Sequence, residues 1–404
     1  MAAEHRVMRA LLLIQLISMG AMEMSGPFWP LHMQTLLGRD HQAYSGLFAG
    51  LVYAGPMLTA MVFTPCWGRL GDRVGHKLMI VRALIALAIC QSLSGLVTDP
   101  WLLIVTRMAQ GGLAGFLAAA QAYALSLNLQ NGQGRTIAKL QSATAAGSLA
   151  GPVLGGWLME FYSFAVLCHL SAALCVCCAL VSFRLPDTTA RFRSARRPEA
   201  PLPRGWIGAL LLIIVLIQAA KVMPQPFYAL YVTQVLHATP SLIGITYALS
   251  AASLALTAPL WGRLFDQWQP PRILQVIEWV TWLSALTVAV GALANEWLTF
   301  VVSRLLWGVW QGALLPVAYA LIASTLPKPR HGFALGLGNS AAKAGALAGV
   351  LIGGIGMSLM GLPNSFWLVA LTYIIAALAV RAIRATHCAG SCLPYSSTPG
   401  KTQQ

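Results

Sequence analysis

The chain has 404 residues, of which 57% are hydrophobic and only 9% are charged, against about 25% charged residues in soluble domains. A water-soluble fold has no use for so much apolar surface, so the composition predicts a membrane protein with several spans. The net charge of +15 raises the idea of a nucleic-acid partner. The basic residues are spread over many short connectors and form no single face or arm, which argues against that partner.

Twelve apolar segments follow one another, each long enough to cross a bilayer at about 20 residues per helix. The predicted spans are 7–30, 44–67, 78–97, 101–125, 138–160, 164–183, 206–232, 241–262, 272–294, 297–323, 332–358 and 363–383. We expect an all-α integral membrane fold of twelve transmembrane helices in two pseudo-symmetric six-helix bundles. The predicted division is a first bundle at 1–183, a mobile cytoplasmic linker at 184–205, a second bundle at 206–384 and a cytoplasmic tail at 385–404.

The distribution of basic residues predicts the orientation. With both termini in the cytoplasm, cytoplasmic segments hold 21 of the 26 Lys and Arg residues, and the external loops hold only Arg39. Basic residues collect on the cytoplasmic side of membrane proteins. The sequence therefore predicts a multi-pass protein of the cell inner (cytoplasmic) membrane with both ends inside. Four basic residues remain within spans, namely Arg107, Lys221, Arg304 and Lys343.

A ten-residue stretch of glycine and charge, residues 68–77, separates the second and third predicted spans. Its candidate gating residues are Gly68, Gly71, Asp72, Arg73, Gly75 and Lys77. The glycines allow a tight connector, and an ion pair between Asp72 and its basic neighbours is expected. The simpler alternative is an ordinary basic cytoplasmic loop. The pattern G-x-L-x-D-R-x-G-x-K resembles the loop between helices 2 and 3 of major facilitator superfamily transporters, which implies a role in gating.

The two halves of the chain repeat each other at an offset near 197 residues. Pro27 and Phe28 recur as Pro226 and Phe227, and Arg107 recurs as Arg304. Six-span repeats of this kind place the substrate site near the midplane between the halves. The second copy of the charged stretch has lost most of its small and basic residues, so we expect the first copy to carry the gate.

A glycine-rich motif lies in the fifth span, at Gly147, Gly151, Pro152, Gly155 and Gly156. Glycines four apart let another backbone approach closely, and an internal proline bends a helix. Plain small-residue packing is the alternative interpretation. The pattern G-x-x-x-G-P-x-x-G-G resembles the drug:proton antiporter branch of the superfamily, which favours export over import. The second copy has Val350 in place of Pro152, so Gly349 is expected to be less sensitive to substitution than Gly151.

Four residues are candidates for proton coupling: Glu23, Arg107, Lys221 and Glu278. The segment containing Arg107 and Gln110 resembles the R-x-x-Q-G element of the fourth span in the same branch, where the arginine is tied to proton coupling. Ionisable residues within spans mark functional sites by default. Glu23 lies deeper in its span than Glu278, which makes it the better proton carrier. Lys221 is its near-counterpart in the second half and could face it across the cavity. A static ion pair is the alternative role for Glu23, Lys221 and Glu278, and a bond to backbone carbonyls or to Tyr123 is the alternative for Arg107.

Seven residues are candidates for substrate binding: Phe28, Trp29, Tyr123, Phe227, Tyr231, Tyr319 and Lys343. Aromatic side chains around a central cavity would suit an amphipathic or apolar substrate. Most aromatic residues in membrane spans serve only packing or interfacial anchoring, so this alternative stays open for each of them.

These features predict a monomeric secondary active transporter that exports a small molecule by proton antiport, through alternating access of two halves in the lipid bilayer. The substrate could be many drugs or one metabolite such as a siderophore or sugar, and a proton-coupled importer is a further alternative. No P-loop is present, so ATP is not the direct energy source. No enzyme motif is found, and we expect no cofactor and no metal, since Cys388 and Cys392 have no second Cys/His pair nearby.

Overall fold

The computed structural model describes residues 2–38, 44–127, 133–187, 204–268, 270–294, 296–324 and 331–391. The first half contains α1 (Ala2–Met24), the short 3-10 helix η1 (Gly26–Phe28), α2 (Trp29–Leu37), α3 (Ser45–Val74), α4 (His76–Leu96), α5 (Pro100–Leu113), α6 (Phe116–Ser126), α7 (Gln133–Phe161) and α8 (Phe164–Phe183). The second half contains α9 (Arg204–Val222), α10 (Tyr228–Gln234), α11 (Pro240–Asp266), α12 (Pro270–Ala292), α13 (Trp297–Ser324), α14 (His331–Met360) and α15 (Ser365–Ser391).

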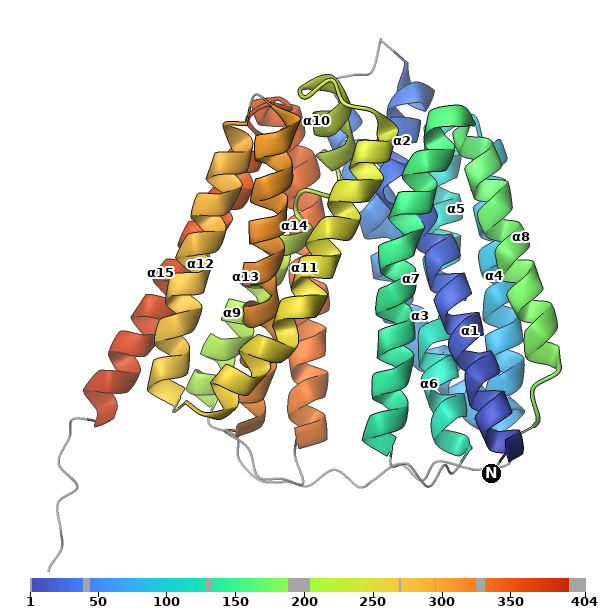
Figure 1. Cartoon of the computed structure of the whole chain (residues 1–404), viewed down its shortest axis with the longest axis horizontal. Helices are drawn as coiled ribbons and strands as arrows, with labels where there is room; N and C mark the ends of the chain where they lie inside the picture. Colours follow the sequence, from blue (N-terminus) through green and yellow to red (C-terminus); the bar gives the residue numbers. More distant parts are fainter. Residues whose placement is uncertain are drawn as a thin grey trace, which may run out of the picture.

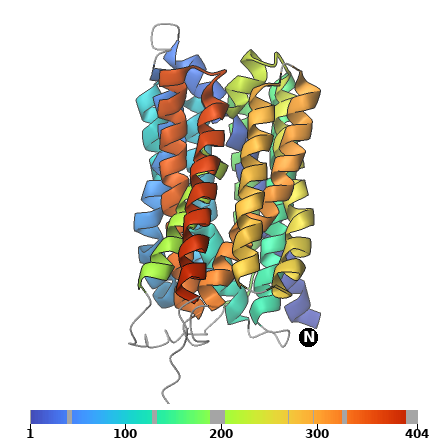
Figure 2. The ribbon, with the colours of Figure 1, turned by 90° about the vertical axis from the view of Figure 1, so that its left-hand side faces the viewer.

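The predicted all-α class with two six-span bundles is confirmed. Among the described residues, nine helical segments are long and apolar enough to cross a membrane, and Ile207–Val222 is a shorter apolar helix. Helices α1 to α8 form one bundle and α9 to α15 the other, and the helices of both run along a common direction (Figures 1 and 2). The start of α1 and the end of α15 lie at the same end of the molecule. Helix α15 continues to Ser391, past the predicted boundary at 384.

Three spans are broken into two helices each, which the sequence analysis did not predict. Span 1 breaks between α1 and α2, span 4 between α5 and α6, and span 7 between α9 and α10. The breaks in spans 1 and 7 fall on the repeated Pro27 and Pro226, because proline cannot continue the helical hydrogen bonds. The break in span 4 ends at Gly115, whose φ of 100° is a conformation that glycine adopts without strain.

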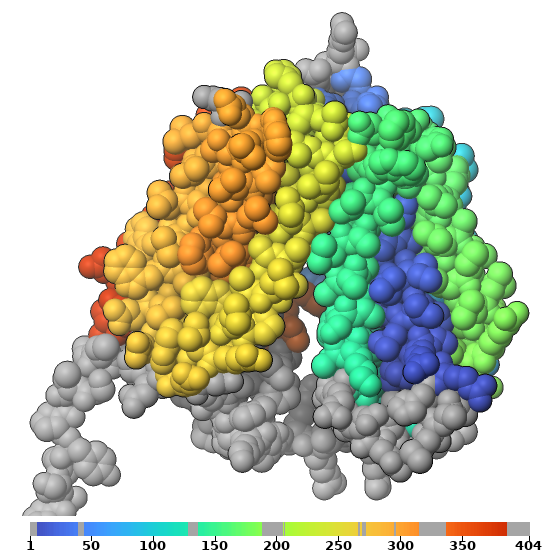
Figure 3. Space-filling view, in the orientation of Figure 1, coloured from blue at the N-terminus to red at the C-terminus, as the bar shows by residue number. Residues whose placement is uncertain are grey.

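The two halves converge at the end away from the N-terminus and separate toward the N-terminal end (Figure 1). Contacts between the halves run mainly through α7 against α11 and through α3 against α14. At the closed end, the Gln234 side-chain amide donates a 2.6 Å hydrogen bond to Gln34. The space-filling view shows a hollow between α11 and α7 toward the N-terminal end (Figure 3). The structure is therefore a state that is open at one end only.

Glycines make the contacts between the halves very close. A Cβ atom on Gly244 of α11 would lie 2.8 Å from the carbonyl carbon of Pro152. A Cβ atom on Gly156 of α7 would lie 2.9 Å from the carbonyl oxygen of Pro240. On the other side of the interface, a Cβ atom on Gly354 of α14 would lie 3.0 Å from the Cα of Gly50 in α3. These separations leave no room for a side chain, so backbone contacts seal the closed end.

Glycines within each half are equally crowded, which contradicts the expected asymmetry of the fifth and eleventh spans. In α7, added Cβ atoms on Gly147 and Gly151 would lie 2.5 Å from carbonyl oxygens of α1, and Gly155 also packs against α1, at Met24. In α14, the same atom on Gly349 would lie 2.7 Å from the Cα of Ala219 in α9. Helix α7 also runs unbroken through Pro152. The structure gives no packing reason for Gly349 to be the milder position, because both helices pack backbone to backbone.

The polar stretch at 68–77 is also shorter as a connector than expected. Helix α3 continues through Gly68 and Gly71 to Val74, and α4 begins at His76. Gly75 alone forms the turn, with a φ of 106°. The expected ten-residue loop is therefore two helix ends joined at one glycine, because the charged residues extend both helices beyond their apolar parts.

We predict that Gly151→Leu and Gly349→Leu lower the thermal unfolding temperature of the purified protein to a similar extent. Each leucine must displace a neighbouring backbone, and overpacking of this kind costs about 1–3 kcal/mol or more, equivalent to about 1–4 °C in a chain of this length. Gly208→Leu in α9 is the matched control, since a Cβ atom there meets nothing within 4 Å. A Gly349→Leu protein as stable as the control would contradict the packing described here.

Candidate functional site

Arg107 of α5 is held by three elements of the first half. Its Nε donates to the carbonyl oxygen of Val52 at 3.4 Å, and its Nη1 donates to the side-chain oxygen of Gln110. The guanidinium lies over the Trp29 ring, 4.3 Å from the ring centre. Arginine stacks on aromatic rings in this way while its N–H groups remain free to donate hydrogen bonds. Arg107 thus joins α3 and α5 to the start of α2.

A chain of amides connects Arg107 to the break in span 1. Gln110 donates to the side-chain oxygen of Gln91 at 3.0 Å, and Gln91 donates to the hydroxyl of Ser25 at 2.8 Å. Next to it, the Tyr53 hydroxyl donates to the carbonyl oxygen of Gly26 at 2.6 Å. These bonds satisfy polar groups that a bilayer would leave without partners. The network fixes the break in place.

Glu23 lies in the last turn of α1, immediately before this break. Its Oε2 is 3.0 Å from the position that a Cβ atom on Gly26 would take, and its Cβ is 2.9 Å from that position on Gly151. The carboxylate therefore occupies a space that only glycines leave open. It interacts electrostatically with Arg107. Among the described residues, no direct ion pair joins Glu23 to either Arg107 or Lys221.

Two tyrosines that repeat each other in spans 2 and 8, Tyr53 and Tyr247, separate the charged centres of the two halves. Tyr53 interacts electrostatically with Glu23 and with Tyr247. Tyr247 interacts electrostatically with Glu23 and with Arg304. The structure thus does not bring Glu23 and Lys221 into contact in this state. It places Glu23 beside the arginine of its own half.

A cavity of about 300 Å³ lies between α7 of the first half and α9, α11 and α13 of the second. Lys221 and Arg304 both line it, together with Tyr247. The Arg304 guanidinium lies 4.6 Å from the centre of the Tyr228 ring and 4.1 Å from that of Trp307. Trp307 is held by a 3.1 Å hydrogen bond from its indole N–H to the Tyr373 hydroxyl. The second half therefore presents its basic side chains to the space between the halves.

Glu278 lies elsewhere. It is on α12, and its carboxylate is 3.1 Å from Nη1 of Arg384 on α15. Both of these helices belong to the second half and pack on each other. The structure therefore gives Glu278 a fixed partner, as the static alternative for this residue expected.

The aromatic residues predicted to bind substrate are packed in the protein interior. Phe28, Phe227 and Tyr231 are at most 1% exposed. Tyr231 lies in a ring cluster with Phe300 and Phe366.

Three more of the predicted substrate residues, Tyr123, Trp29 and Lys343, also lie away from the cavity between the halves. Tyr123 is fully buried, and its hydroxyl donates to the carbonyl oxygen of Pro186 at 2.9 Å. Trp29 is stacked under Arg107 and is 1% exposed. Lys343 is exposed on α14 and does not line the cavity. The side chain of Tyr319 lies outside the described residues. In this state, packing is the observed role of these aromatics.

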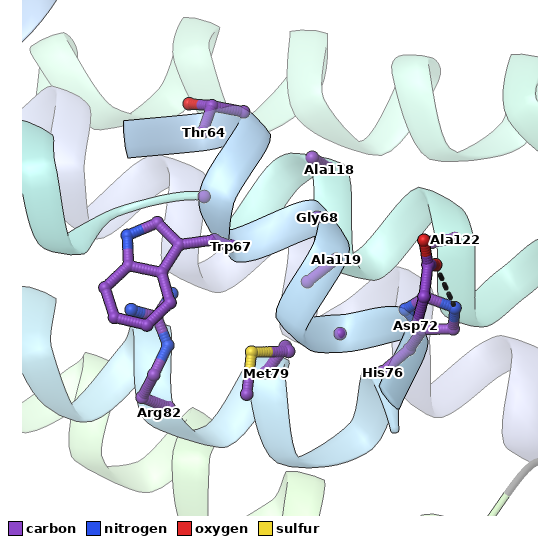
Figure 4. Close-up of a pocket in the computed structure, with 12 residues that line it drawn as sticks. Thr64, Trp67, Gly68, Asp72, His76, Met79, Arg82, Ala118, Ala119 and Ala122 are labelled. Atoms are coloured by element: carbon purple, nitrogen blue, oxygen red, sulfur yellow. Dashed lines mark ion pairs between the residues drawn. The ribbon is translucent and has the colours of Figure 1, made fainter. Parts of the chain in front are cut away.

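The predicted gate surrounds a second, smaller cavity of about 120 Å³ at the junction of α3 and α4 (Figure 4). Asp72 is exposed, and its carboxylate lies 3.8 Å from Nε2 of His76. Lys77 pairs instead with Asp187, at 3.4 Å. A Cβ atom on Gly71 would lie 3.1 Å from Met79.

The remaining predicted gate residues are less constrained in this state. Arg73 is exposed, and a Cβ atom on Gly68 would meet nothing within 4 Å. Asp72 thus has His76, one of its basic neighbours in the stretch, as its partner, and the space beside Gly68 is open in this state.

Arg82 ties the gate region to the break in span 4. Its guanidinium lies 3.5 Å from the centre of the Trp67 ring and donates to the carbonyl oxygen of Ala114 at 2.9 Å. Sequence reasoning counted Arg82 only as a basic residue near a loop. It also missed Gln91, Gln225, Gln311 and Trp307 as site residues. Amide side chains within apolar spans were the available signal for the three glutamines, since such groups are costly there without partners.

Two curated proteins are similar to this chain over most of its length. The multidrug resistance protein MdtG of Dickeya zeae (strain Ech586) is 31% identical over 306 residues, which is 73% of this chain and 74% of that protein. The staphyloferrin B transporter of Staphylococcus aureus (strain NCTC 8325 / PS 47) is 28% identical over 364 residues, which is 85% of each chain.

Solved structures share the fold. A bacterial homolog of the human lysosomal transporter Spinster, in an inward-facing and unoccupied conformation, has a TM-score of 0.77 at 14% identity, over 96% of this chain and 98% of that one. The nucleoside transporter NupG has a TM-score of 0.78 at 14% identity, over 93% and 98%. The sequence profile of the Major Facilitator Superfamily matches residues 11–219 and 210–387. This chain is therefore a multi-pass membrane protein that belongs to the Major Facilitator Superfamily, a family of transporters and not of enzymes.

Proposed function

We propose that the protein exports a small molecule across the cytoplasmic membrane in exchange for protons, by alternating access of its two halves. The observation that supports this most is the position of Glu23. A carboxylate lies at the break in span 1, within electrostatic reach of Arg107 but in no direct ion pair with it. A carboxylate in a membrane must be protonated, paired, or alternate between these states. Glu23 is free to alternate.

Arg107 is the second member of this proposed proton site. It is anchored through Gln110 and through the Trp29 ring, so it keeps its place while the carboxylate changes its charge. The break in span 1 lies beside Tyr53 and Tyr247, where the two halves meet. A change in the separation of the two halves would alter how closely Tyr247 approaches Glu23. This supplies a physical link between the protonation of Glu23 and the opening of the halves.

The direction of transport follows from the relatives and from the charge pattern. One relative bears the name of a multidrug resistance protein, and the fifth-span motif resembles drug:proton antiporters. The excess of basic residues on the side of the termini supports an orientation with both ends in the cytoplasm. In that orientation the open end faces the cytoplasm, so this state would load a cytoplasmic substrate for export.

A dedicated exporter of one metabolite is the second candidate. It is favoured by the similarity to the staphyloferrin B transporter, which covers 85% of this chain. In both versions the protein works in the bilayer with protons and a small molecule as its partners, and a monomer holds both halves of the site. The two versions differ only in how many compounds the cavity accepts.

We predict that Glu23→Gln abolishes proton-driven export and leaves substrate binding measurable, because glutamine keeps the shape but cannot carry the proton. A compound is first chosen by growth assays in a bacterium that lacks its main efflux pumps. Its transport is then measured in proteoliposomes with and without a pH gradient. Glu296→Gln is the matched control, since Glu296 is exposed. If the Glu23→Gln protein still concentrates the compound when a pH gradient is applied, Glu23 is not the proton carrier.

We predict that Asp72→Asn slows transport at least about tenfold, which corresponds to ~1.4 kcal/mol, and leaves the unfolding temperature unchanged. Asp72 is exposed in this state and 3.8 Å from His76, so its proposed role belongs to the state in which the cytoplasmic end closes. Asp187→Asn, which removes the partner of Lys77, should keep most of the transport rate. Wild-type transport by the Asp72→Asn protein would remove this residue from the gate.

A further inference from the structure

The second half reproduces the arginine site of the first half. Arg107 and Arg304 occupy equivalent positions at an offset of 197 residues. Each guanidinium lies over an aromatic ring that directly follows a repeated Pro-Phe pair, Trp29 in the first half and Tyr228 in the second. The repeat therefore provides an internal comparison of two related charge sites in one protein.

The two sites differ in the charge that accompanies the arginine. In the first half Arg107 has the carboxylate of Glu23 nearby. Pro27 and Pro226 differ by 199 residues, so the position equivalent to Glu23 is Val222, and the basic residue of the second site is its neighbour Lys221. Lys221 and Arg304 line the same cavity of about 300 Å³, and the described residues around this cavity include no Asp or Glu. The first site is internally compensated, whereas the second holds two positive charges.

Polar atoms at the second site lack partners within the described part of the chain. Arg304 is 7% exposed and Gln311 is 3% exposed, yet Nε of Arg304 and Oε1 of Gln311 make no hydrogen bond. The buried Oε1 of Gln225 is also without one. Buried polar groups are normally hydrogen-bonded, and a buried cation without a partner is costly. Such a set of groups leaves donors and acceptors available to a partner from outside the protein.

We propose that this cavity binds the anionic group of the substrate, a carboxylate or phosphate-type oxyanion on a molecule with an apolar part. The proposal rests on the exporter function given above and names its substrate class. The planar Arg304 fork suits an oxyanion, and Lys221 adds a second donor. The free amide oxygens of Gln225 and Gln311 would accept hydrogen bonds from substrate hydroxyl or N–H groups. Leu149, Leu254 and Trp307 line the rest of the cavity and would contact the apolar part.

The test compares two probes with the same ring and opposite charge, naphthoate and naphthylmethylammonium. Their binding to the purified full-length protein in a neutral maltoside detergent is measured by calorimetry, without a pH gradient. Wild-type protein should bind naphthoate at least about tenfold more tightly, the worth of one charge-assisted hydrogen bond. Equal affinity for the two probes, or no binding of naphthoate, would overturn the proposal.

Variants of Lys221 make the test specific to this cavity. Lys221→Met should weaken naphthoate binding about tenfold or more, and Lys221→Glu, which puts a carboxylate into the cavity that Arg304 also lines, should abolish the preference for the anion. Lys139→Met is the matched control, because Lys139 is exposed on α7 and does not line this cavity; it should bind as the wild type does. Unchanged naphthoate binding by both Lys221 variants would overturn the proposal.

Stability gives an independent readout if a variant binds nothing. Removal of an uncompensated cation should leave the unliganded Lys221→Met protein at least as stable to heat as the wild type. A clear loss of stability would show that the protein itself pairs Lys221, and would overturn the proposal.

Lipid headgroups carry the same oxyanion chemistry as the proposed substrate. Displacement of naphthoate by equimolar phosphatidylglycerol would assign the cavity to lipid and overturn its assignment to substrate.

The binding test is separate from the test of proton-driven export. A protein that prefers naphthoate but fails to use a pH gradient would refute the proposed antiport and leave the anion site standing. A protein that exports with a pH gradient but binds both probes equally would refute the anion site and leave the proposed antiport standing.

Discussion

The absence of water from the bilayer core is the constraint on which this structure depends. A helix satisfies its own backbone, so each break in a span requires partners from other helices. The carbonyl oxygen of Gly26, at the break in span 1, accepts from Tyr53. The carbonyl oxygen of Ala114, at the break in span 4, accepts from Arg82. Non-helical backbone is thus found where polar side chains of neighbouring spans reach it.

The same constraint explains why the ionisable side chains are informative. Arg107 is surrounded by an amide chain and an aromatic ring, whereas Arg304 has aromatic rings and an unsatisfied Nε. The two halves thus share a scaffold but not a charge balance. We infer that duplication supplied two equivalent positions and that they now serve different purposes, a proton site in the first half and an anion site in the second.

Close backbone packing supports the movement that such a protein needs. Glycines of α3, α7, α11 and α14 let the helices of the two halves approach backbone to backbone. Small residues let helices approach closely in membranes. Helix surfaces packed through small residues can shift relative to each other with a small change in free energy. The side chains that could lock them, such as Gln34 and Gln234, lie at the closed end.

The sequence by itself determined the number and order of the spans, the repeat of the two halves and the family resemblance. These depend on local composition and on short motifs, so they can be read along the chain. Glu23 and Arg107 were each singled out from the sequence, because an in-span charge is rare and a motif marked the arginine, but the sequence suggested Lys221 as the neighbour of Glu23. The breaks in spans 1, 4 and 7 were not predicted, although Pro27 and Pro226 mark two of them.

Only the tertiary structure decided which distant segments meet. It paired Glu278 with Arg384, buried Tyr123 against Pro186 and left Glu23 apart from Lys221. It also showed Gly349 to be as crowded as Gly151, although the two motifs differ at the following residue. Such contacts depend on how helices pack across the bundle. Spacing along one helix shows which of its faces is small, polar or charged, but it does not show which surface of another helix that face will meet.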